Sequence, residues 1–408
     1  MHINVNTAPL ISNERINKTT ITYGFRQGDD EVSEAVKKNV LNIIENLIEP
    51  FIDVDFFEET RSGKADINYQ LHDEEDDDGY VKYACERCHD VFLSRVNDDA
   101  TSNNSYSSFQ CGIGSFGFFA LIHETLHALG LKHPGNYNGK GGSEGPFLPY
   151  DEDNTTNTVM SYNFTGNSSS MPMLYDIAAL RKLYGYKALN SDDTVYKFSS
   201  VYGFNDGKVD WGSKTNRTKA LITDSGGTNT LDFSQLPTNY TGGYLFDLSS
   251  GDIITTQSDF GDKIAKTGTA YNPRNFDKDD TEGDGDDQRV LSVTEYTTTF
   301  GTVVDRETRI QNIIGSSSND IIYGNYYTEY ISGGDGDDKI QTAFDQNTDS
   351  FRPSKNRVYL GEDGNDSILA SWDGDTLYGG TGNDTLTGLQ GDDVLYGGTG
   401  HDTLNGGA

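Results

Sequence analysis

One short stretch of the sequence carries the residue types of a metal-dependent hydrolase. It is an HExxH motif that begins at His123, continues with Glu124 and ends at His127. Histidines four residues apart share one face of an α-helix, so they can bind one Zn²⁺ with the glutamate beside the open coordination position. Gly130 can adopt a positive φ and let the chain leave the helix sharply, which delivers His133 as a third ligand.

These ligands need a scaffold, and hydrophobic periodicity supplies a first outline of it. Apolar residues at helical spacing predict one helix over Asp30–Glu49 and a second, metal-binding helix over Ile113–Leu129. Short runs rich in β-formers predict strands around these helices. The predicted strands are Ile21–Phe25, Ile52–Phe57, Ala65–Leu71, Tyr80–Tyr83 and Val91–Val96. Among them, Tyr80–Tyr83 is the candidate edge strand for an extended substrate.

The C-terminal third of the sequence repeats every nine residues. From Gly361 it reads GEDGNDSIL, ASWDGDTLY, GGTGNDTLT, GLQGDDVLY and GGTGHDTLN. The same frame holds from Gly315 to Gln341, and an insertion, Thr342–Leu360, separates the two blocks. An acidic residue occupies the sixth place and an aliphatic residue the eighth. The pattern matches the calcium-binding β-helix repeat of repeats-in-toxin (RTX) proteins.

The nonapeptide pattern predicts a parallel β-solenoid held by calcium. Six glycine-rich residues form a turn and three form a strand, so two nonapeptides make a coil of 18 residues. Asp366 then stacks on Asp384, and Asp384 on Asp402. Stacked carboxylates repel one another unless a cation lies between them, and carboxylate and carbonyl oxygens suit Ca²⁺. The predicted calcium ligands are Asp320, Asp338, Asp366, Asp375, Asp384, Asp393 and Asp402.

Together the two motifs resemble a known family. HExxHxxGxxH followed by a methionine turn, here Thr158–Tyr162, is the metzincin signature. Within the metzincins, the segments HALGLKHPGNYN, VMSY and MLYDIAALRKLYG look like the serralysins, secreted bacterial endopeptidases with a calcium β-roll behind the catalytic domain. The resemblance covers the chain from about Thr20 to its C-terminus.

The resemblance implies a fold and several residue roles. It implies an α+β metzincin catalytic domain over residues 1–186, with a twisted mixed sheet plus the active-site helix. An all-β parallel β-roll, or solenoid, follows over residues 187–408. By the same analogy Met160 packs beneath the zinc ligands, and Tyr162 binds zinc at rest and swings to stabilise the oxyanion. Asp224–Ser234 resembles a family calcium segment in which Asn229 replaces a common Asp.

The expected function is that of a secreted zinc-dependent endopeptidase, stabilised by calcium and acting on proteins or peptides. One catalytic Zn²⁺ activates a water, Glu124 accepts the proton as general base, and the leaving amine receives it afterwards. Zn²⁺ and, by analogy, Tyr162 stabilise the oxyanion. The alternative is a catalytically weak, calcium-dependent surface or binding protein that retains a metzincin fold.

Composition narrows the class of partner. The 408 residues carry 64 Asp and Glu against 31 Lys and Arg, a formal charge of −33. Such a surface repels nucleic acid and anionic membranes, so we expect neither as a partner. No apolar run approaches the roughly 20 residues of a membrane span. We expect a monomer, exported to the extracellular space without an N-terminal signal peptide, because the first residues lack a basic region followed by an apolar stretch.

Several further signals stay open at this level. Three cysteines allow one disulfide, with Cys111 pairing with Cys85 or Cys88 as the preferred arrangement and a second zinc site including His89 as the alternative. The glycine pattern at 112–117 predicts a turn into a helix rather than a dinucleotide site, and GxSxG at 141–145 predicts a loop. The acidic runs at 73–78 and 277–287 predict solvated loops; the first could also favour basic substrate residues and the second bind calcium weakly.

Overall fold

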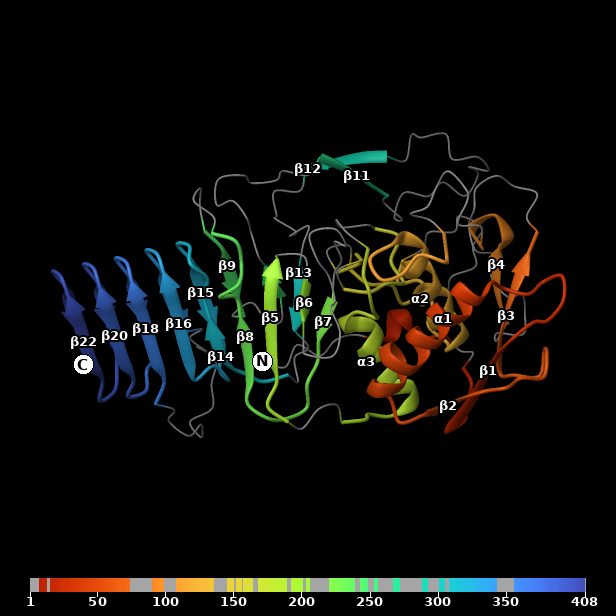
Figure 1. Cartoon of the computed structure of the whole chain (residues 1–408), viewed down its shortest axis with the longest axis horizontal. Helices are drawn as coiled ribbons and strands as arrows, with labels where there is room; N and C mark the ends of the chain where they lie inside the picture. Colours follow the sequence, from red (N-terminus) through yellow and green to blue (C-terminus); the bar gives the residue numbers. More distant parts are fainter. Residues whose placement is uncertain are drawn as a thin grey trace.

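Helices lie at one end of the elongated molecule and a long stack of parallel strands at the other in the computed structural model (Figure 1). The structure describes residues 7–12, 15–73, 90–98, 108–135, 145–149, 152–155, 157–163, 168–188, 192–200, 203–205, 220–238, 243–248, 253–255, 267–271, 288–292, 301–304, 308–342 and 356–407. Two of the predicted features, the edge strand Tyr80–Tyr83 and the acidic run at 277–287, lie outside these ranges.

The N-terminal half contains a four-stranded sheet in the order β2-β1-β3-β4. Its strands are β1 Thr20–Phe25, β2 Asp55–Glu58, β3 Ile67–His72 and β4 Asp90–Ser94. All three pairings between these strands are parallel. The predicted mixed sheet stays a prediction, because one of its expected strands lies outside the described residues. The strand expected at Tyr80–Tyr83, between β3 and β4 in the chain, is not among them.

Helix α1, Glu34–Asn42, begins later than predicted because Ser33 caps it. The Ser33 hydroxyl accepts a backbone N–H of the first turn at 3.4 Å. Beyond α1 the chain continues as a π-helical segment, Ile43–Ile48, and a 3₁₀ turn, Glu49–Phe51. The predicted regular helix over Asp30–Glu49 is therefore shorter and irregular at its end, although its apolar face is buried as expected.

Two more helices complete this half. Helix α2 spans Phe116–Ala128 and α3 spans Leu174–Tyr184. The first confirms the helix predicted over Ile113–Leu129, and the glycine pattern before it forms the predicted turn, with Ser115 as N-cap. In Figure 1, α3 lies between α2 and the first strands of the roll. The chain leaves this half through Tyr186, which forms a β-bridge with Ile52.

The C-terminal half is a β-roll of two facing parallel sheets. One has eight strands in the order β22-β20-β18-β16-β14-β8-β5-β6, in which only the β5–β6 pair is antiparallel, and the other has six, β23-β21-β19-β17-β15-β9. The strands of the first are β5 Val195–Ser200, β6 Gly203–Asn205, β8 Asn229–Asp232, β14 Ile310–Ile314, β16 Tyr330–Asp335, β18 Val358–Asp363, β20 Thr376–Thr381 and β22 Val394–Thr399. Those of the second are β9 Leu245–Asp247, β15 Ile321–Gly324, β17 Lys339–Thr342, β19 Ser367–Leu369, β21 Thr385–Thr387 and β23 Thr403–Asn405.

The pairing register confirms the predicted coil. Thr376 pairs with Val394 and Thr385 with Thr403, which places equivalent residues 18 apart in neighbouring strands. The eighth-place aliphatic residues point inward and are fully buried in all but the last coils. These buried residues are Ile322, Ile331, Ile340, Ile368, Leu377 and Leu386.

The insertion between the two repeat blocks is shorter than predicted. Its proposed first residue, Thr342, ends β17, and its last three belong to β18. Across it, equivalent residues are 28 rather than 18 apart, as Tyr330 pairs with Val358. Tyr359 fills the inward place that an aliphatic residue fills elsewhere, and it is 1% exposed. An aromatic residue in that place interrupts the nine-residue sequence pattern, but the strand pairing continues through it.

The roll also begins earlier than the nonapeptides do. Its first coils, from β5 to β9, do not follow the nine-residue frame, and aromatic side chains lie in their interior. Phe233 stacks on Phe246 with ring centroids 3.8 Å apart, and Phe198 lies 4.5 Å from Phe233. Two small sheets flank these coils: β10 Ile253–Thr255, β13 Gly301–Val304 and β7 Ala220–Ile222, and β11 Thr267–Tyr271 with β12 Gln288–Ser292. The exact domain division at residues 186 and 187 stays a prediction.

Candidate metal centre

Helix α2 carries the first two histidines and the glutamate of the predicted site. The Ser115 hydroxyl accepts the Phe118 N–H at 3.1 Å, which caps the helix. The Tyr69 hydroxyl of β3 bonds to Thr125 Oγ1 at 2.9 Å, which fixes the helix against the sheet. At the far end Gly130 has a φ of +93° and turns the chain out of the helix, as the sequence predicted.

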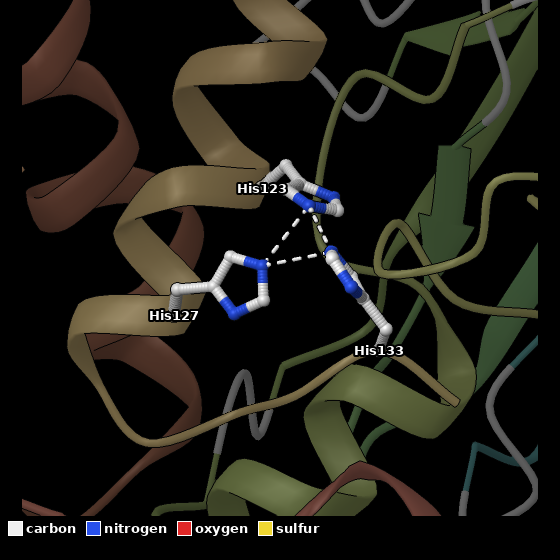
Figure 2. A group of neighbouring side chains, drawn as sticks. All are labelled: His123, His127 and His133. Atoms are coloured by element: carbon white, nitrogen blue, oxygen red, sulfur yellow. Dashed lines mark hydrogen bonds between the residues drawn. The ribbon is translucent and has the colours of Figure 1, made fainter. Parts of the chain in front are cut away.

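The three predicted histidines meet at one point. Figure 2 shows their Nε2 atoms converging from α2 and from the segment that follows it. The Nε2 atoms of His123 and His127 are 3.1 Å apart, those of His123 and His133 are 3.2 Å apart, and those of His127 and His133 are 3.1 Å apart. Among the described residues, this is the group of three His, Cys, Asp or Glu side chains whose ligand atoms all lie within 4.8 Å of one another.

Backbone carbonyls set the tautomer of two of these rings. His123 Nδ1 lies 2.7 Å from the Val159 carbonyl, and His127 Nδ1 lies 2.8 Å from the Leu131 carbonyl. A carbonyl oxygen only accepts, so each Nδ1 carries the proton and donates it. Both Nε2 atoms are then bare acceptors that face each other. That arrangement is repulsive unless a cation lies between them, so the rings are oriented for a metal.

The electrostatics keep the imidazoles neutral, which is the form that binds metal. Burial lowers the pKa of His123 to about 4. Burial and the neighbouring His123 lower the pKa of His133 to about 2. Burial, together with the other two histidines, holds the pKa of His127 well below its ordinary value. A metal ion therefore does not have to displace protons from these rings near neutral pH.

Glu124 stands beside the histidines in a dry environment. It is 8% exposed, and its Oε1 lies 3.9 Å from His123 Nε2. Burial raises the pKa of this carboxyl well above its ordinary value. Burial opposes the ionised form, whereas a divalent cation on the histidines would favour it, because a bound ion is the largest local charge in such a site. A carboxyl in this position is suited to accept and return a proton.

The methionine turn lies next to the histidines, as the sequence predicted. Met160 is fully buried in it. The ring of Tyr162 lies 4.5 Å from that of His133 and 5.9 Å from that of His123, measured between centroids. Tyr162 is 43% exposed, so its side chain borders the histidines from the solvent side.

A residue that the sequence reasoning missed ties this turn to α3. The buried carboxylate of Asp176 accepts from Thr158 Oγ1 at 2.5 Å and from the N–H groups of Val159 and Met173 at 2.8 Å each. The Val159 carbonyl in turn accepts from His123 Nδ1. Asp176 is fully buried, and burial raises its pKa to about 7 against the effect of its three donors. It therefore fixes the peptide that orients one histidine.

We expect Asp176→Ala to weaken zinc binding about tenfold, at the lower end of the range for residues that orient metal ligands. The loss of the carboxylate frees the Val159 peptide and with it the His123 ring. Asp176→Asn should retain most of the affinity, since its carbonyl can still accept both N–H groups. Competition with a chromogenic chelator measures the affinity of each variant. An alanine variant with a lower melting temperature but unchanged zinc affinity would show that Asp176 only stabilises the fold.

A second set of acidic groups lines the roll. Asp384 Oδ1 accepts the Asp366 N–H at 2.9 Å, and Asp402 Oδ1 accepts the Asp384 N–H at 3.0 Å. Asp393 and Asp375 are joined in the same way at 2.8 Å, which confirms the predicted stacking. The second carboxylate oxygen is buried without a hydrogen-bond partner in four of the seven predicted ligands. These are Asp338, Asp366, Asp384 and Asp393.

The partnerless oxygens lie where a cation fits. A Cβ added to Gly379 would lie 2.3 Å from Asp384 Oδ2 and 2.4 Å from the carbonyl oxygen of Gly397 in the next coil. The same convergence occurs at Gly361, next to Asp366. Two oxygens that face one small space, one of them charged and otherwise unpaired, suit a hard cation such as Ca²⁺.

The segment predicted as a further calcium site satisfies its own polar groups. Asp224 Oδ2 accepts from the Tyr196 hydroxyl at 2.9 Å. The Asn229 amide donates to the carbonyls of Gly226 and Arg309, at 3.0 Å each. These two carbonyl oxygens, which could otherwise be ligands of a cation, therefore accept hydrogen bonds from the amide nitrogen.

Other predicted features lie partly outside the described residues. Cys111 is described and half-buried, but Cys85, Cys88 and His89 are not, so the disulfide and the second zinc site stay predictions. Most of the acidic run at 73–78 and of the GxSxG segment is likewise outside the described ranges. Among the described helices, none has the length and apolarity needed to cross a membrane.

Comparison with protein families matches the repeats. Residues 310–340, 358–386 and 378–408 fit the family described as the RTX calcium-binding nonapeptide repeat (4 copies). The repeats therefore indicate calcium binding.

Comparison with characterised proteins finds several proteases. Serralysin C of Dickeya chrysanthemi is 40% identical over 137 residues, which cover 30% of this chain and 28% of that protein. Serralysin of Proteus mirabilis is 31% identical over 226 residues, covering 52% and 36%. Metalloprotease AprA of Pseudomonas entomophila (strain L48) is 34% identical over 188 residues, covering 39% and 38%. The chain thus spans about a third of the length of these relatives.

Proposed function

The similarities and the repeats mark the chain as a serralysin-family protein, and we propose that it is a zinc-dependent endopeptidase folded and stabilised by calcium. The observation that carries the proposal is the meeting of three imidazole Nε2 atoms, all within 3.2 Å of one another, beside the buried carboxyl of Glu124.

The donor set fits zinc. Tetrahedral ligands at the usual zinc–nitrogen distance of about 2.0–2.1 Å lie roughly 3.3–3.4 Å from one another. The three Nε2–Nε2 distances of 3.1 to 3.2 Å are close to that value. Three histidines leave one position open, which is typical of catalytic rather than structural zinc sites. When bound, the ion supplies a water of lowered pKa and polarises the scissile carbonyl.

The side chains around that position then have different roles. His123, His127 and His133 hold the ion in neutral form. Glu124 takes the proton of the attacking water and passes it to the leaving amine, as general base and then general acid. The hydroxyl of Tyr162 donates a hydrogen bond to the scissile carbonyl oxygen as that oxygen becomes negatively charged. Gly130 and Met160 support the ligands, the first by the turn out of α2 and the second from within the methionine turn.

Calcium stabilises the roll in this proposal. The predicted ligands comprise seven aspartates, four of which have the unpaired buried oxygen described above. Positive charge between coils offsets the repulsion between stacked carboxylates and satisfies those oxygens. We assign residues 1–186 to the catalytic domain and 187–408 to the roll. We further propose that the chain acts as an extracellular monomer on protein or peptide substrates.

Removal of zinc tests the proposal directly. With calcium in excess, a zinc-selective chelator should abolish cleavage of unfolded casein, and added Zn²⁺ should restore it. Mg²⁺ should not, because it prefers oxygen ligands in octahedral geometry. The assay follows release of acid-soluble peptides.

A folded chain, loaded with both zinc and calcium, that cleaves no casein would contradict a general protease. It would favour the alternative, a calcium-dependent binding protein with a metzincin fold. Circular dichroism of the same sample establishes that it is folded.

A further inference from the structure

The two edges of the roll differ in chemistry. The first edge is the set of turns whose sixth-place residues are Asp320, Asp338, Asp366, Asp384 and Asp402. The second edge lies at the start of the strands β8, β14, β16, β18, β20 and β22. Its residues in register from β14 onward are Gln311, Glu329, Arg357, Asp375 and Asp393, and a register shift at Gln311 separates them from Asn229 of β8. Only Asp375 and Asp393 are aspartates, although the backbone pairing from β14 onward is the same.

Arg357 stands where the repeat places an aspartate. Its N–H donates to Asp375 Oδ1 at 3.0 Å, which is the bond that a sixth-place residue makes to the next coil. Its guanidinium is buried, with the residue 5% exposed. Nε donates to the Thr328 carbonyl at 3.0 Å, in the preceding turn. Nη1 donates to Ser371 Oγ at 2.7 Å and to Asp373 Oδ2 at 3.2 Å, in the following turn.

The guanidinium therefore joins three successive turns of the second edge. It donates hydrogen bonds to the oxygens of a backbone carbonyl, a hydroxyl and a carboxylate. A guanidinium is permanently charged and offers donors in a fixed plane, so it can neutralise acidic turns as a bound cation does. The side chain is attached to the chain and cannot be removed by a chelator.

The next turn of this edge has also lost the space for an ion. The nonapeptide there begins with Ala370, where most others begin with glycine. On the first edge a Cβ at the equivalent Gly361 would lie 2.1 Å from Asp366 Oδ2. An alanine at this place therefore leaves no room for the aspartate in the position that Asp366 has. Asp375 instead turns Oδ2 to Ser371, whose N–H and hydroxyl donate at 2.8 and 2.6 Å. Both of its oxygens are thus paired within the protein.

We propose that Arg357 replaces a calcium ion on the second edge, so that the turn from Ala370 to Asp375 is closed by a guanidinium and a serine and takes no metal. Calcium then occupies the first edge, where the small spaces beside Gly333, Gly361 and Gly379 remain open. Within the described part of the second edge such a space remains only at the following turn, beside Gly388, where Asp393 Oδ2 has no partner. The inference rests on the calcium part of the proposed function and is independent of zinc and of catalysis.

Two matched substitutions test it. Asp375→Asn and Asp384→Asn each neutralise one sixth-place aspartate in neighbouring nonapeptides. Native mass spectrometry of the full chain at saturating Ca²⁺ counts the ions. Asp384→Asn should bind at least one ion fewer than the wild type, and Asp375→Asn should bind the same number. An equal loss in both variants would overturn the proposal.

A gain of binding provides the second test, which holds even if Asp375→Asn does not fold. Arg357→Asp combined with Ala370→Gly and Ser371→Gly puts aspartate at the sixth place of the first turn and glycine at the first two places of the next. The folded variant should bind at least one more Ca²⁺ than the wild type. Arg309→Asp changes the charge equally at an exposed residue near the same edge and should add none. A folded triple variant without added calcium would contradict the inference.

These outcomes differ from failure of the proposed function. If the wild type itself bound no calcium, the calcium part of that function would be wrong. If it bound calcium but cleaved no casein, a general protease would be contradicted, and the ion counts of the variants would still decide the assignment of the second edge.

Discussion

A chain in which glutamine replaces Glu124 is expected to cleave casein roughly 10²–10⁴-fold more slowly than the wild type. Glutamine has nearly the same shape but cannot accept a proton, so the attacking water loses its base. The side chain is buried and lies beside His123 without ligating in our proposal, so zinc content should not change. The measurement is kcat/KM for a quenched peptide derived from casein, with zinc determined on the same sample.

The matched control is Glu34→Gln, which makes the same change in the exposed first turn of α1. Its activity should stay within about twofold of the wild type, because exposed substitutions away from a site have little effect. A Glu124→Gln variant that binds zinc and retains wild-type kcat/KM would exclude Glu124 as the general base and require another proton acceptor.

Removal of calcium is expected to unfold the roll. Each site that binds only the folded chain contributes about 4 kcal/mol when calcium is a thousandfold above its Kd. Several such sites together are comparable to the whole stability of an ordinary domain, about 5–15 kcal/mol. Without the ions, four buried carboxylate oxygens lack any partner. Addition of a calcium chelator should abolish most of the β-sheet signal in far-ultraviolet circular dichroism.

Excess Ca²⁺ should restore that signal, whereas Mg²⁺ should not, since it requires a tighter octahedral shell of oxygens. An unchanged spectrum and an unchanged melting temperature in chelator would contradict a structural role for calcium.

The same calcium-free sample should respond to pH in a defined direction. Burial raises the pKa of Asp338 to about 9 and that of Asp366 to about 7 in the folded chain. A carboxyl with a higher pKa in the folded than in the unfolded chain binds its proton more tightly when folded. Its stabilising effect is present below about pH 4 and is lost as the pH rises to between 7 and 9. The calcium-free chain should therefore be more folded at about pH 5 than at about pH 8.

The meeting of the three histidines could be predicted because their spacing is local. His123 and His127 lie four positions apart on one helix, and Gly130 makes the turn that returns His133. Asp176 could not be found in the same way. Its bonds to Thr158 and Val159 join residues 18 and 17 apart through an irregular loop, and no periodicity describes such contacts. The segment MLYDIAALRKLYG contains Asp176, but its pattern does not predict that the carboxylate is fully buried.

The roll was predictable where its interior repeats and not elsewhere. Small aliphatic residues at one fixed place identify the coils from Ile322 onward. The coils before β14 have Phe198, Phe233 and Phe246 in their interior instead, so the nine-residue aliphatic pattern does not extend to them. Arg357 was hidden for a related reason. It lies at the end of the insertion, where the nine-residue frame is lost, although the backbone register continues through it.

The coil register has an evolutionary consequence. Equivalent residues recur after 18 positions, and each coil contacts chiefly the coil before and the coil after it. Duplication or deletion of one such unit recreates the contacts it interrupts, so the length of the roll can drift without disturbing the histidines at the other end of the molecule. The 28-residue step between β16 and β18 shows that even an irregular unit is tolerated. Selection can therefore lengthen or shorten the roll almost independently of the part of the chain that carries the histidines.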